Sequence, residues 1–359
     1  MDIEVAWRKE DLAILTSIKN YNLNELKQIF LELGEKQYRA EQVFKWLYID
    51  KANSFDEMTN LSIELRKKLK QNFEITEYTI LKKQVSKDGT KKYLFRLSDK
   101  NTIETVLMEY KYGKSICVST QIGCKMGCKF CASTGIGFVR NLTSAEIIEQ
   151  ILAVEKDENV KVSNVVFMGI GEPLDNYDNV VNAIRIINNQ KGINIGARHM
   201  SISTSGLVPR IYNLADENIQ CTLSISLHAT NNKKRSSLMP INNLYSIEEL
   251  IKACKYYIKK TNRRVSFEYA LIKGENDTLD DAKGLIRLLK GMLCHVNLIQ
   301  VNKIETRLFE KSNNENIINF RNYLNENGIV ATIRRELGSD IEAACGQLRR
   351  SAATGNVLK

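Results

Sequence analysis

The sequence predicts an α/β fold in which repeated strand–helix units build a parallel sheet, closed fully or partly into a barrel. From about residue 115, β-branched and aliphatic runs alternate with helical patterns along the rest of the 359-residue chain. Parallel strands need crossover connections, and six or seven such units favour a barrel over a doubly wound sheet. The candidate strands begin near Ile116, Val162, His199, Cys221, Val265, His295 and Val330.

Two of the intervening helices carry a clear start signal. Thr143 with Glu146, and Ser246 with Glu249, have the spacing of a capping box, in which side chains and backbone at a helix start exchange hydrogen bonds. We therefore expect helices to begin directly after Thr143 and Ser246.

The region before the predicted barrel divides into two parts. Residues 1–75 read as a small helical domain: Asn22 can cap a first helix that Gly34 ends, and two more helical patterns follow. Residues 76–114 change to a period of two, and Asp88-Gly89 is a hairpin signal between two strand patterns. We expect an antiparallel β extension there and a core domain over residues 115–359.

The composition is that of an ordinary soluble protein, with 43% hydrophobic and 26% charged residues. The longest apolar runs have the length of strands, and the N-terminus lacks the features of a signal peptide, so we expect a cytoplasmic protein without a membrane span. The net charge of +10 fits either nucleic-acid binding or simple solubility. Four arginines near the C-terminus are candidates for RNA contacts or, equally, for an ordinary solvent-exposed surface: Arg334, Arg335, Arg349 and Arg350.

Three of the eight cysteines lie close together, with the spacing C-x3-C-x2-C, on a loop after the first predicted strand of the barrel. Three thiolates suit a four-iron cluster and leave one iron open to a ligand, whereas a structural zinc site needs four ligands and no second pair lies nearby. The motif therefore predicts an iron–sulfur cluster held by Cys124, Cys128 and Cys131.

This motif, with Phe130 before its last cysteine, resembles the radical-SAM superfamily. The resemblance implies a partial (βα)6-type radical-SAM barrel and one [4Fe-4S] cluster, whose open iron binds S-adenosylmethionine. One electron from the cluster then cleaves that cofactor to a 5′-deoxyadenosyl radical.

Further blocks along nearly the whole chain resemble the RlmN family, which methylates adenine carbon 2 in 23S rRNA and some tRNAs. The blocks are Cys117-Val-Ser-Thr-Gln-Ile-Gly-Cys124, Gly137-Phe-Val-Arg-Asn-Leu-Thr143, Met168-Gly-Ile-Gly-Glu-Pro-Leu174, Ser203-Thr-Ser-Gly206, Ser226-Leu-His228, Met239-Pro-Ile-Asn242 and Ala343-Ala-Cys345-Gly-Gln-Leu348.

The resemblance implies a radical methylation, because adenine carbon 2 is electron-poor and resists polar methyl transfer. Two molecules of S-adenosylmethionine are used per turnover. The first methylates Cys345, and the second supplies the radical that removes a hydrogen from this methyl group. The methylene radical adds to adenine, Glu104 accepts the carbon-2 proton, and the Cys117 thiol attacks Cys345 to release the RNA. Without the resemblance, Cys345 and Cys117 would be interpreted as inert buried cysteines, and Glu104 as an outward-facing carboxylate on a strand.

The cofactor contacts that the family implies are Gly171, Glu172, Ser203, Ser226, Leu227, His228 and Asn302. Glycines after a strand let the backbone approach a ligand, and a carboxylate can accept from the cofactor's ammonium group. By itself, His228 reads as a core histidine.

The partners implied are 23S rRNA, tRNA and an electron donor such as flavodoxin or ferredoxin, and we expect a monomer whose N-terminal domain assists RNA binding. Two alternatives remain open. One is the related resistance enzyme that methylates carbon 8, although Pro173 and the Gly137–Thr143 block favour carbon 2. The other is a non-enzymatic RNA-binding protein with a structural iron–sulfur or zinc site.

Overall fold

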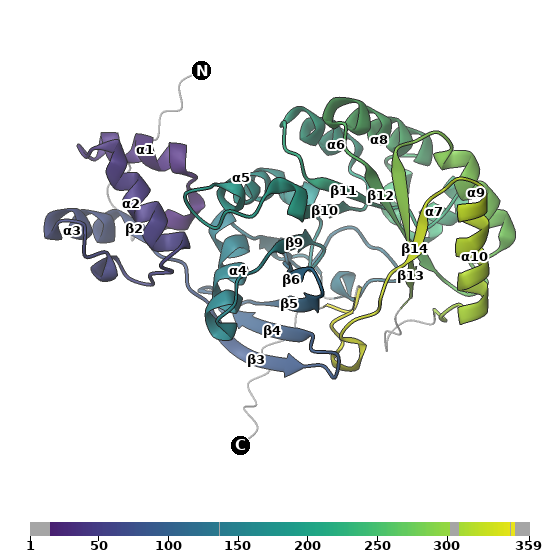
Figure 1. The fold of residues 1–359 in the computed structure, drawn as a ribbon, viewed down its shortest axis with the longest axis horizontal. Coiled ribbons are helices and arrows are strands. Elements are labelled where there is room, and N and C mark those ends of the chain that lie inside the picture. Colours follow the sequence, from purple (N-terminus) through teal and green to yellow (C-terminus); the bar gives the residue numbers. More distant parts are fainter. Residues whose placement is uncertain (1–14, 136, 302–308, 345, 349–359) are drawn as a thin grey trace.

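A computed structural model describes residues 15–135, 137–301, 309–344 and 346–348. The N-terminal helices pack together at one end of the molecule (Figure 1). They are α1 (Leu23–Glu32), α2 (Gln37–Tyr48) and α3 (Ile63–Asn72). Asn22 caps α1 through the full capping box with Glu25. A short parallel pair, β1 (Thr16–Ser17) with β2 (Phe73–Glu74), joins the two ends of this unit and was not predicted.

A single curved sheet dominates the rest of the described chain, with ten strands in the order β14-β13-β12-β11-β10-β9-β6-β5-β4-β3. Its antiparallel strands are β3 (Thr79–Val85), β4 (Lys91–Arg96) and β5 (Thr102–Tyr110). Its parallel strands are β6 (Gly113–Cys117), β9 (Asn164–Phe167), β10 (Met200–Thr204), β11 (Thr222–Ser226), β12 (Val265–Leu271), β13 (Cys294–Gln300) and β14 (Ala331–Ile333). The predicted α/β class with a parallel sheet is confirmed.

Seven helices connect the strands and lie around the outside of the curved sheet (Figure 1). They are α4 (Ser144–Glu158), α5 (Tyr177–Asn188), α6 (Val208–Asp216), α7 (Asn232–Leu238), α8 (Ile247–Thr261), α9 (Leu279–Leu289) and α10 (Asn314–Glu326), counted within the described residues. Both predicted capping boxes are present, at the starts of α4 and α8.

The two faces of the parallel strands differ in polarity. On the face toward the helices, Ile202, Leu223 and Phe267 are completely buried in the main apolar core. The residues that alternate with them are mostly hydroxyl, amide or carboxyl side chains, such as Ser224 and Glu268. Because successive side chains on a strand point to opposite faces, the concave inner face of this sheet is polar.

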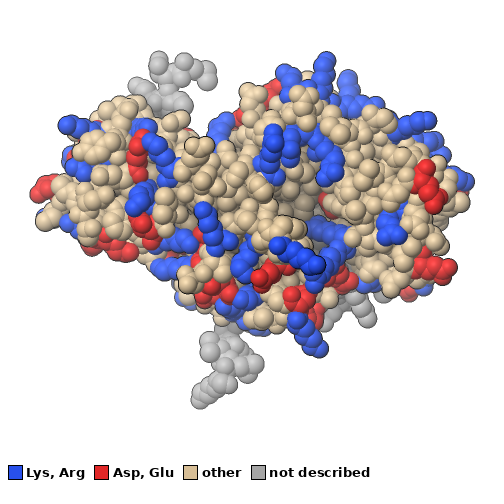
Figure 2. All heavy atoms as spheres, in the orientation of Figure 1, with Lys and Arg blue, Asp and Glu red and all other residues tan. Residues whose placement is uncertain are grey.

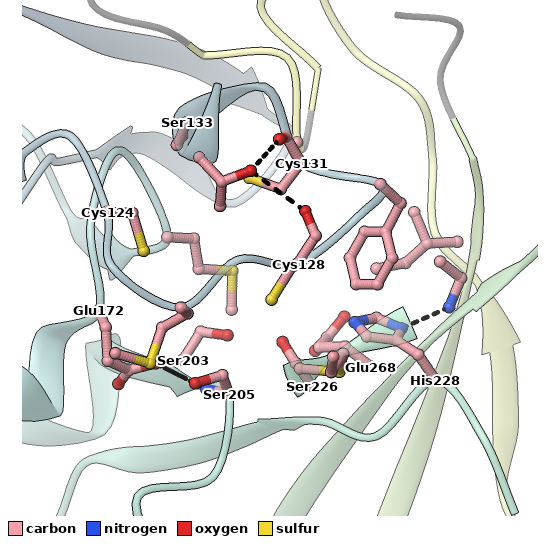
Figure 3. A pocket seen from close by; sticks show the side chains of 18 of the residues that line it. Cys124, Cys128, Cys131, Ser133, Glu172, Ser203, Ser205, Ser226, His228 and Glu268 are labelled. Atoms are coloured by element: carbon pink, nitrogen blue, oxygen red, sulfur yellow. Dashed lines mark hydrogen bonds between the residues drawn. The ribbon is translucent and has the colours of Figure 1, made fainter. Parts of the chain in front are cut away.

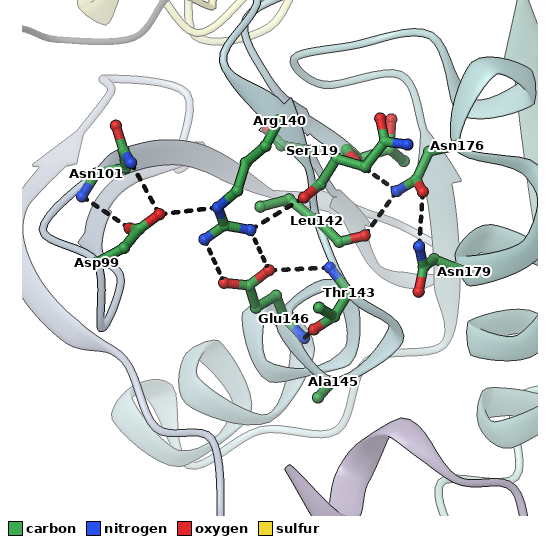
Figure 4. A network of polar contacts seen from close by, with 12 residues as sticks. Asp99, Asn101, Ser119, Arg140, Leu142, Thr143, Ala145, Glu146, Asn176 and Asn179 are labelled. Carbon is green, nitrogen blue, oxygen red and sulfur yellow. Dashed lines mark hydrogen bonds and ion pairs between the residues drawn. The ribbon is translucent and has the colours of Figure 1, made fainter. Parts of the chain in front are cut away.

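A polar network holds the start of α4 against the chain that returns from the cysteine loop (Figure 4). The Arg140 guanidinium donates to both carboxylate oxygens of Glu146 at 2.7 Å and to Asp99 at 2.8 Å. The Asn176 amide donates to the carbonyls of Thr120 and Leu142 at 2.8 and 2.7 Å. These contacts fix both ends of the loop that carries the three clustered cysteines.

A buried ion pair attaches the N-terminal unit to α4. Lys19 is 2% exposed, and its Nζ donates to Glu149 Oε2 at 2.5 Å and to the Thr76 carbonyl at 2.9 Å. The Tyr48 hydroxyl donates to the Lys19 carbonyl at 3.1 Å. Removing one partner of such a pair leaves an uncompensated buried charge, so this contact fixes the unit against the sheet.

We predict that Glu146→Ala lowers the free energy of unfolding by about 2 kcal/mol, because it removes a capping box and leaves Arg140 without its bidentate partner. Glu146→Gln keeps an acceptor at the third helical position and should cost about half as much. Urea unfolding followed by circular dichroism measures both. Equal losses for the two variants would contradict this explanation.

Candidate functional site

The three clustered cysteines line one cavity at the carboxyl ends of the parallel strands. Their loop leaves the sheet after β6 and returns through the short β7–β8 ladder, β7 (Gln121–Ile122) with β8 (Arg140–Asn141). Figure 3 shows the side chains of Cys124, Cys128 and Cys131 on one side of this cavity, with Glu172 and Ser203 on another. The structure therefore brings the predicted cluster ligands together with part of the predicted cofactor site.

Two of the three thiols, those of Cys124 and Cys128, lie in a largely dry environment. Burial raises the pKa of Cys124 to about 12 and raises the pKa of Cys128 further. Thiolates in such a place need bound iron or another cation to stay ionised, because metal coordination deprotonates a thiol outright. Among the described residues, no three His, Cys, Asp or Glu side chains form a group that could hold a single metal ion. Three soft sulfur donors around one cavity fit a four-iron cluster, whose cysteines bind different irons.

Two glycines after β9 let the chain pass close to the cysteine loop. A Cβ atom on Gly169 would lie 2.7 Å from the Val118 carbonyl oxygen, and one on Gly171 would lie 2.6 Å from Gln121 Cβ. Gly171 also has a φ of 109°, which side chains rarely permit. The glycines are therefore required by packing, and they bring Glu172 to the cavity wall.

The Glu172 carboxyl group is held rigidly and is 3% exposed. One oxygen accepts from the Leu174 backbone N–H at 3.0 Å, and the other accepts from the Ser205 N–H and hydroxyl at 2.7 and 2.8 Å. Burial raises the pKa of Glu172, and these hydrogen bonds oppose that increase. The result is a fixed acceptor group at the end of β9, suited to a ligand's ammonium group.

His228 has a left-handed backbone, with a φ of 53°, which is costly for a residue other than glycine. Its Nδ1 accepts from the Ala270 backbone N–H at 2.9 Å, and this hydrogen bond leaves the hydrogen of the neutral ring on Nε2. Phe130 packs edge-on against the ring at 4.6 Å. Burial, followed by the charge of Arg235, lowers the pKa of His228 to about 3, so the ring is neutral at physiological pH.

Arg235, which was not predicted, holds the ends of β10 and β11 together. Its side chain is fully buried, and its guanidinium donates to the carbonyls of Ser205 at 2.6 Å, Ser226 at 3.0 Å and Leu227 at 3.1 Å. Burial lowers the pKa of Arg235 only to about 10, so it remains charged. It places a fixed positive charge near the thiol of Cys128.

A second group of predicted residues lies on β5 and β6. Glu104 is 4% exposed, and its Oε1 is 3.3 Å from Nζ of the buried Lys92, which also donates to the Glu342 carbonyl at 3.1 Å. Cys117 is buried and packs with Val106, its partner on β5. Lys92 was not predicted.

The residues on either side of position 345 contact both the cysteine loop and the residues on β5 and β6. Ala343 and Leu348 belong to the same apolar cluster as Cys117. The Gly346 carbonyl accepts from the Ala132 N–H at 2.8 Å, and the Leu348 carbonyl accepts from the Ser133 hydroxyl at 2.7 Å. The described residues on either side of position 345 thus contact both the cysteine loop and the β5–β6 pair.

Most predicted site residues line the cysteine cavity, namely Cys124, Cys128, Cys131, Gly171, Glu172, Ser203, Ser226 and His228. The Leu227 side chain lies in the apolar core instead, so only its backbone is near the site. Asn302 and Cys345 lie outside the described residues. Sequence analysis missed Glu268, which lines the same cavity; its signal was a charged side chain in the middle of a predicted strand.

We predict that His228 makes the fold sensitive to acid. Below pH 6.5 the unfolded chain takes up a proton on this ring, whereas the folded chain does not until about pH 3. The unfolded state then binds more protons, so the free energy of unfolding falls as the pH falls through this window, by about 2 kcal/mol at pH 5 from this residue. Urea unfolding at pH 5 and 8 should show a smaller pH effect in His228→Asn. The exposed His199→Asn is the matched control, and an equal effect in both variants would refute the prediction.

Two family models match separate parts of the chain. The ribosomal RNA large subunit methyltransferase N-terminal domain matches residues 16–75. The radical SAM superfamily matches residues 118–289, which include the cysteine loop, both glycines and His228.

Similar proteins cover nearly the whole chain. A protein of Clostridium novyi named "Probable dual-specificity RNA methyltransferase RlmN" is 53% identical, over 95% of this chain and 100% of its own length. Another with the same name, from Caldanaerobacter subterraneus, is 54% identical over 93% and 98%. The crystal structure of a radical SAM methyltransferase from Sphaerobacter thermophilus matches with a TM-score of 0.88 and 44% identity, over 93% of this chain and 99% of that one. The chain belongs to the RlmN family of radical-SAM RNA methyltransferases.

Proposed function

We propose that this protein methylates carbon 2 of an adenosine in 23S rRNA, and of an adenosine in tRNA, through a methyl group carried on Cys345. The observation that supports this most is the set of contacts that the described neighbours of position 345 make. Gly346 accepts a hydrogen bond from the cysteine loop, and Ala343 packs against the β5–β6 pair. A carrier between a radical source and a base has to lie at such a place.

Cys124, Cys128 and Cys131 would hold a [4Fe-4S] cluster at the wall of the cavity, and Glu172 would accept from the ammonium group of S-adenosylmethionine. When bound, this cofactor pair supplies a methyl group to Cys345 and the radical that removes a hydrogen from that methyl group. Arg235 keeps the strand ends in place around the cavity. The neutral His228 ring offers a fixed Nε2–H donor.

The remaining steps use side chains on β5 and β6. After the methylene carbon bonds to carbon 2, the Glu104 carboxylate would take the carbon-2 proton, and the unpaired electron of the adduct would return to the oxidised cluster that supplied the reducing electron. The Cys117 thiol would then attack the Cys345 sulfur, forming a disulfide and transferring the bonding electrons to the new methyl carbon, which takes up a proton. The buried Lys92 ammonium beside Glu104 favours the ionised carboxylate that this step needs.

An RNA substrate fits the charge of the molecule. The net charge is +10, and Figure 2 shows Lys and Arg side chains around the hollow near the middle of one face. Phosphate backbones bind such surfaces by releasing their counterions. None of the helices among the described residues is long and apolar enough to cross a lipid bilayer. We further propose two S-adenosylmethionine molecules per turnover, an electron donor such as flavodoxin or ferredoxin, and a monomeric enzyme.

The test is anaerobic incubation of the reconstituted protein with 23S rRNA or tRNA and S-adenosylmethionine, followed by nucleoside mass spectrometry. We predict 2-methyladenosine, its complete loss in Cys345→Ala, and an RNA–protein adduct in Cys117→Ala that a denaturing gel retains. The adduct is expected because the bond between Cys345 and the RNA then lacks its attacking thiol. The half-buried Cys294→Ala is the matched control and should retain activity.

Two results would contradict the proposal. Formation of 8-methyladenosine would show that the protein methylates carbon 8 of adenine, as the related resistance enzyme does, and not carbon 2. Unchanged methylation in Cys345→Ala would exclude this residue as the carrier.

A further inference from the structure

The turn between β3 and β4, residues 86–90, lies against residues 338–344, which lead to the proposed carrier at position 345 (Figure 1). We call residues 338–344 the carrier segment. Each hydrogen bond between the turn and this segment joins residues at least 250 positions apart in sequence. Asp88 of the turn accepts from the Gly338 backbone N–H at 2.9 Å. A carboxylate of the antiparallel extension therefore holds the start of the carrier segment.

A second carboxylate makes the reverse contact. Asp340 of the carrier segment accepts from the Ser86 hydroxyl at 2.6 Å and from the Lys87 backbone N–H at 3.2 Å. These hydrogen bonds lower the pKa of Asp340, so its carboxyl group is ionised at physiological pH. Hydrogen bonds to an ionised acceptor are stronger than those between neutral groups. The turn and the carrier segment are thus joined from both sides.

Close packing surrounds these hydrogen bonds. Gly338 has a φ of 67°, and a Cβ atom there would lie 2.7 Å from Ala343 Cβ and 2.9 Å from Thr90 Cγ2. Thr90 and Ala343 are buried. On β4, the buried Lys92 donates to the Glu342 carbonyl at 3.1 Å. The carrier segment therefore packs against the hairpin so closely that only glycine fits at position 338.

The described residues around position 345 are held as well. The Gly346 carbonyl accepts from Ala132 of the cysteine loop. The Gln347 N–H donates to the Ala344 carbonyl at 3.0 Å, and the Ala344 N–H donates to Gln347 Oε1 at 3.1 Å. Because consecutive α-carbons are only about 3.8 Å apart, fixed neighbours on both sides limit the reach of a side chain at position 345.

We propose that Asp340 is a positioning residue for the methyl carrier: its bonds to the β3–β4 turn hold the carrier segment so that the Cys345 sulfur meets the cofactor and the base. The inference rests on the proposed function, in which Cys345 carries the methyl group. It gives the antiparallel extension a part in the reaction. Lys92, on the same hairpin, lies beside the proposed proton acceptor Glu104, so one hairpin holds both the carrier and the proton acceptor.

A purely structural role predicts a different behaviour. A contact that only stabilises the fold changes the amount of active protein, so all products fall together when it is lost. A contact that positions the carrier leaves cleavage of S-adenosylmethionine intact. The 5′-deoxyadenosyl radical then takes its hydrogen from another donor, such as excess reductant, and not from the methyl group. The ratio of 5′-deoxyadenosine to 2-methyladenosine therefore separates the two roles.

The experiment uses reconstituted protein with 23S rRNA, S-adenosylmethionine and a one-electron reductant, and both nucleosides are quantified in the same sample. The proteins are the wild type, Ser86→Ala, Asp340→Ala, the double variant and the control Asp280→Ala, whose carboxylate on α9 is 92% exposed. Hydrogen–deuterium exchange of each protein without RNA reports local opening of the carrier segment independently of catalysis.

Asp340→Ala should raise the ratio about two- to tenfold, which is the factor that one hydrogen bond is worth. Ser86→Ala should raise it in the same range, and the double variant should not exceed Asp340→Ala, because both substitutions remove the same contact. Exchange should become faster in the carrier segment and stay unchanged in β12. The control Asp280→Ala should match the wild type in both measurements.

Three results would overturn the inference: an unchanged ratio in Asp340→Ala, unchanged exchange in its carrier segment, or effects of the two single substitutions that multiply in the double variant. Ser86→Ala removes only one hydroxyl group, so it keeps the test decisive if Asp340→Ala does not fold. A wild type that forms 5′-deoxyadenosine but no methylated adenosine would instead overturn the proposed function.

Discussion

The alternation of polar and apolar residues along the parallel strands is the constraint on which this structure depends. Parallel strands are usually buried on both faces and read as continuous apolar runs. Here only the face toward the helices is apolar, as at Leu223 and Phe267, while Ser224 and Glu268 face inward. Side chains that could pack into an apolar barrel core are thus missing from one face, and the interior stays open as a chamber for polar ligands.

An open interior gives the strand ends little packing of their own, so other contacts must fix them. Arg235 draws together the carbonyls at the ends of β10 and β11, and Ser205 binds the carboxylate of Glu172. At the end of β9, Gln121 accepts from the Glu172 N–H at 2.8 Å. The cavity wall is therefore rigid before any ligand binds, which reduces the entropy lost on binding and favours a defined geometry for radical chemistry.

The fold was predictable because its signals are local. Seven strand patterns and two capping boxes, such as Thr143 with Glu146, depend on neighbours within a few residues, and all are present. The cysteine motif was equally visible. Arg235 was not, because it follows two lysines and reads as a solvent-exposed residue; only the tertiary structure shows that it is fully buried. Lys92 and Glu268 were missed for the same reason, since their burial depends on strands far apart in sequence.

These three buried charges carry an argument about function. Burying an ion pair usually gives a lower free energy of unfolding than burying apolar residues of similar size. An ion pair in the interior is therefore weak evidence that the pair stabilises the fold. Lys92 with Glu104, and Glu268 near Arg334, lie inside the curved sheet, where apolar side chains would give a firmer core. A chain that keeps these ionic groups in its interior does so at a cost in stability. For the proposed function, the physical return is a Glu104 carboxylate that the Lys92 ammonium holds in place to take a proton.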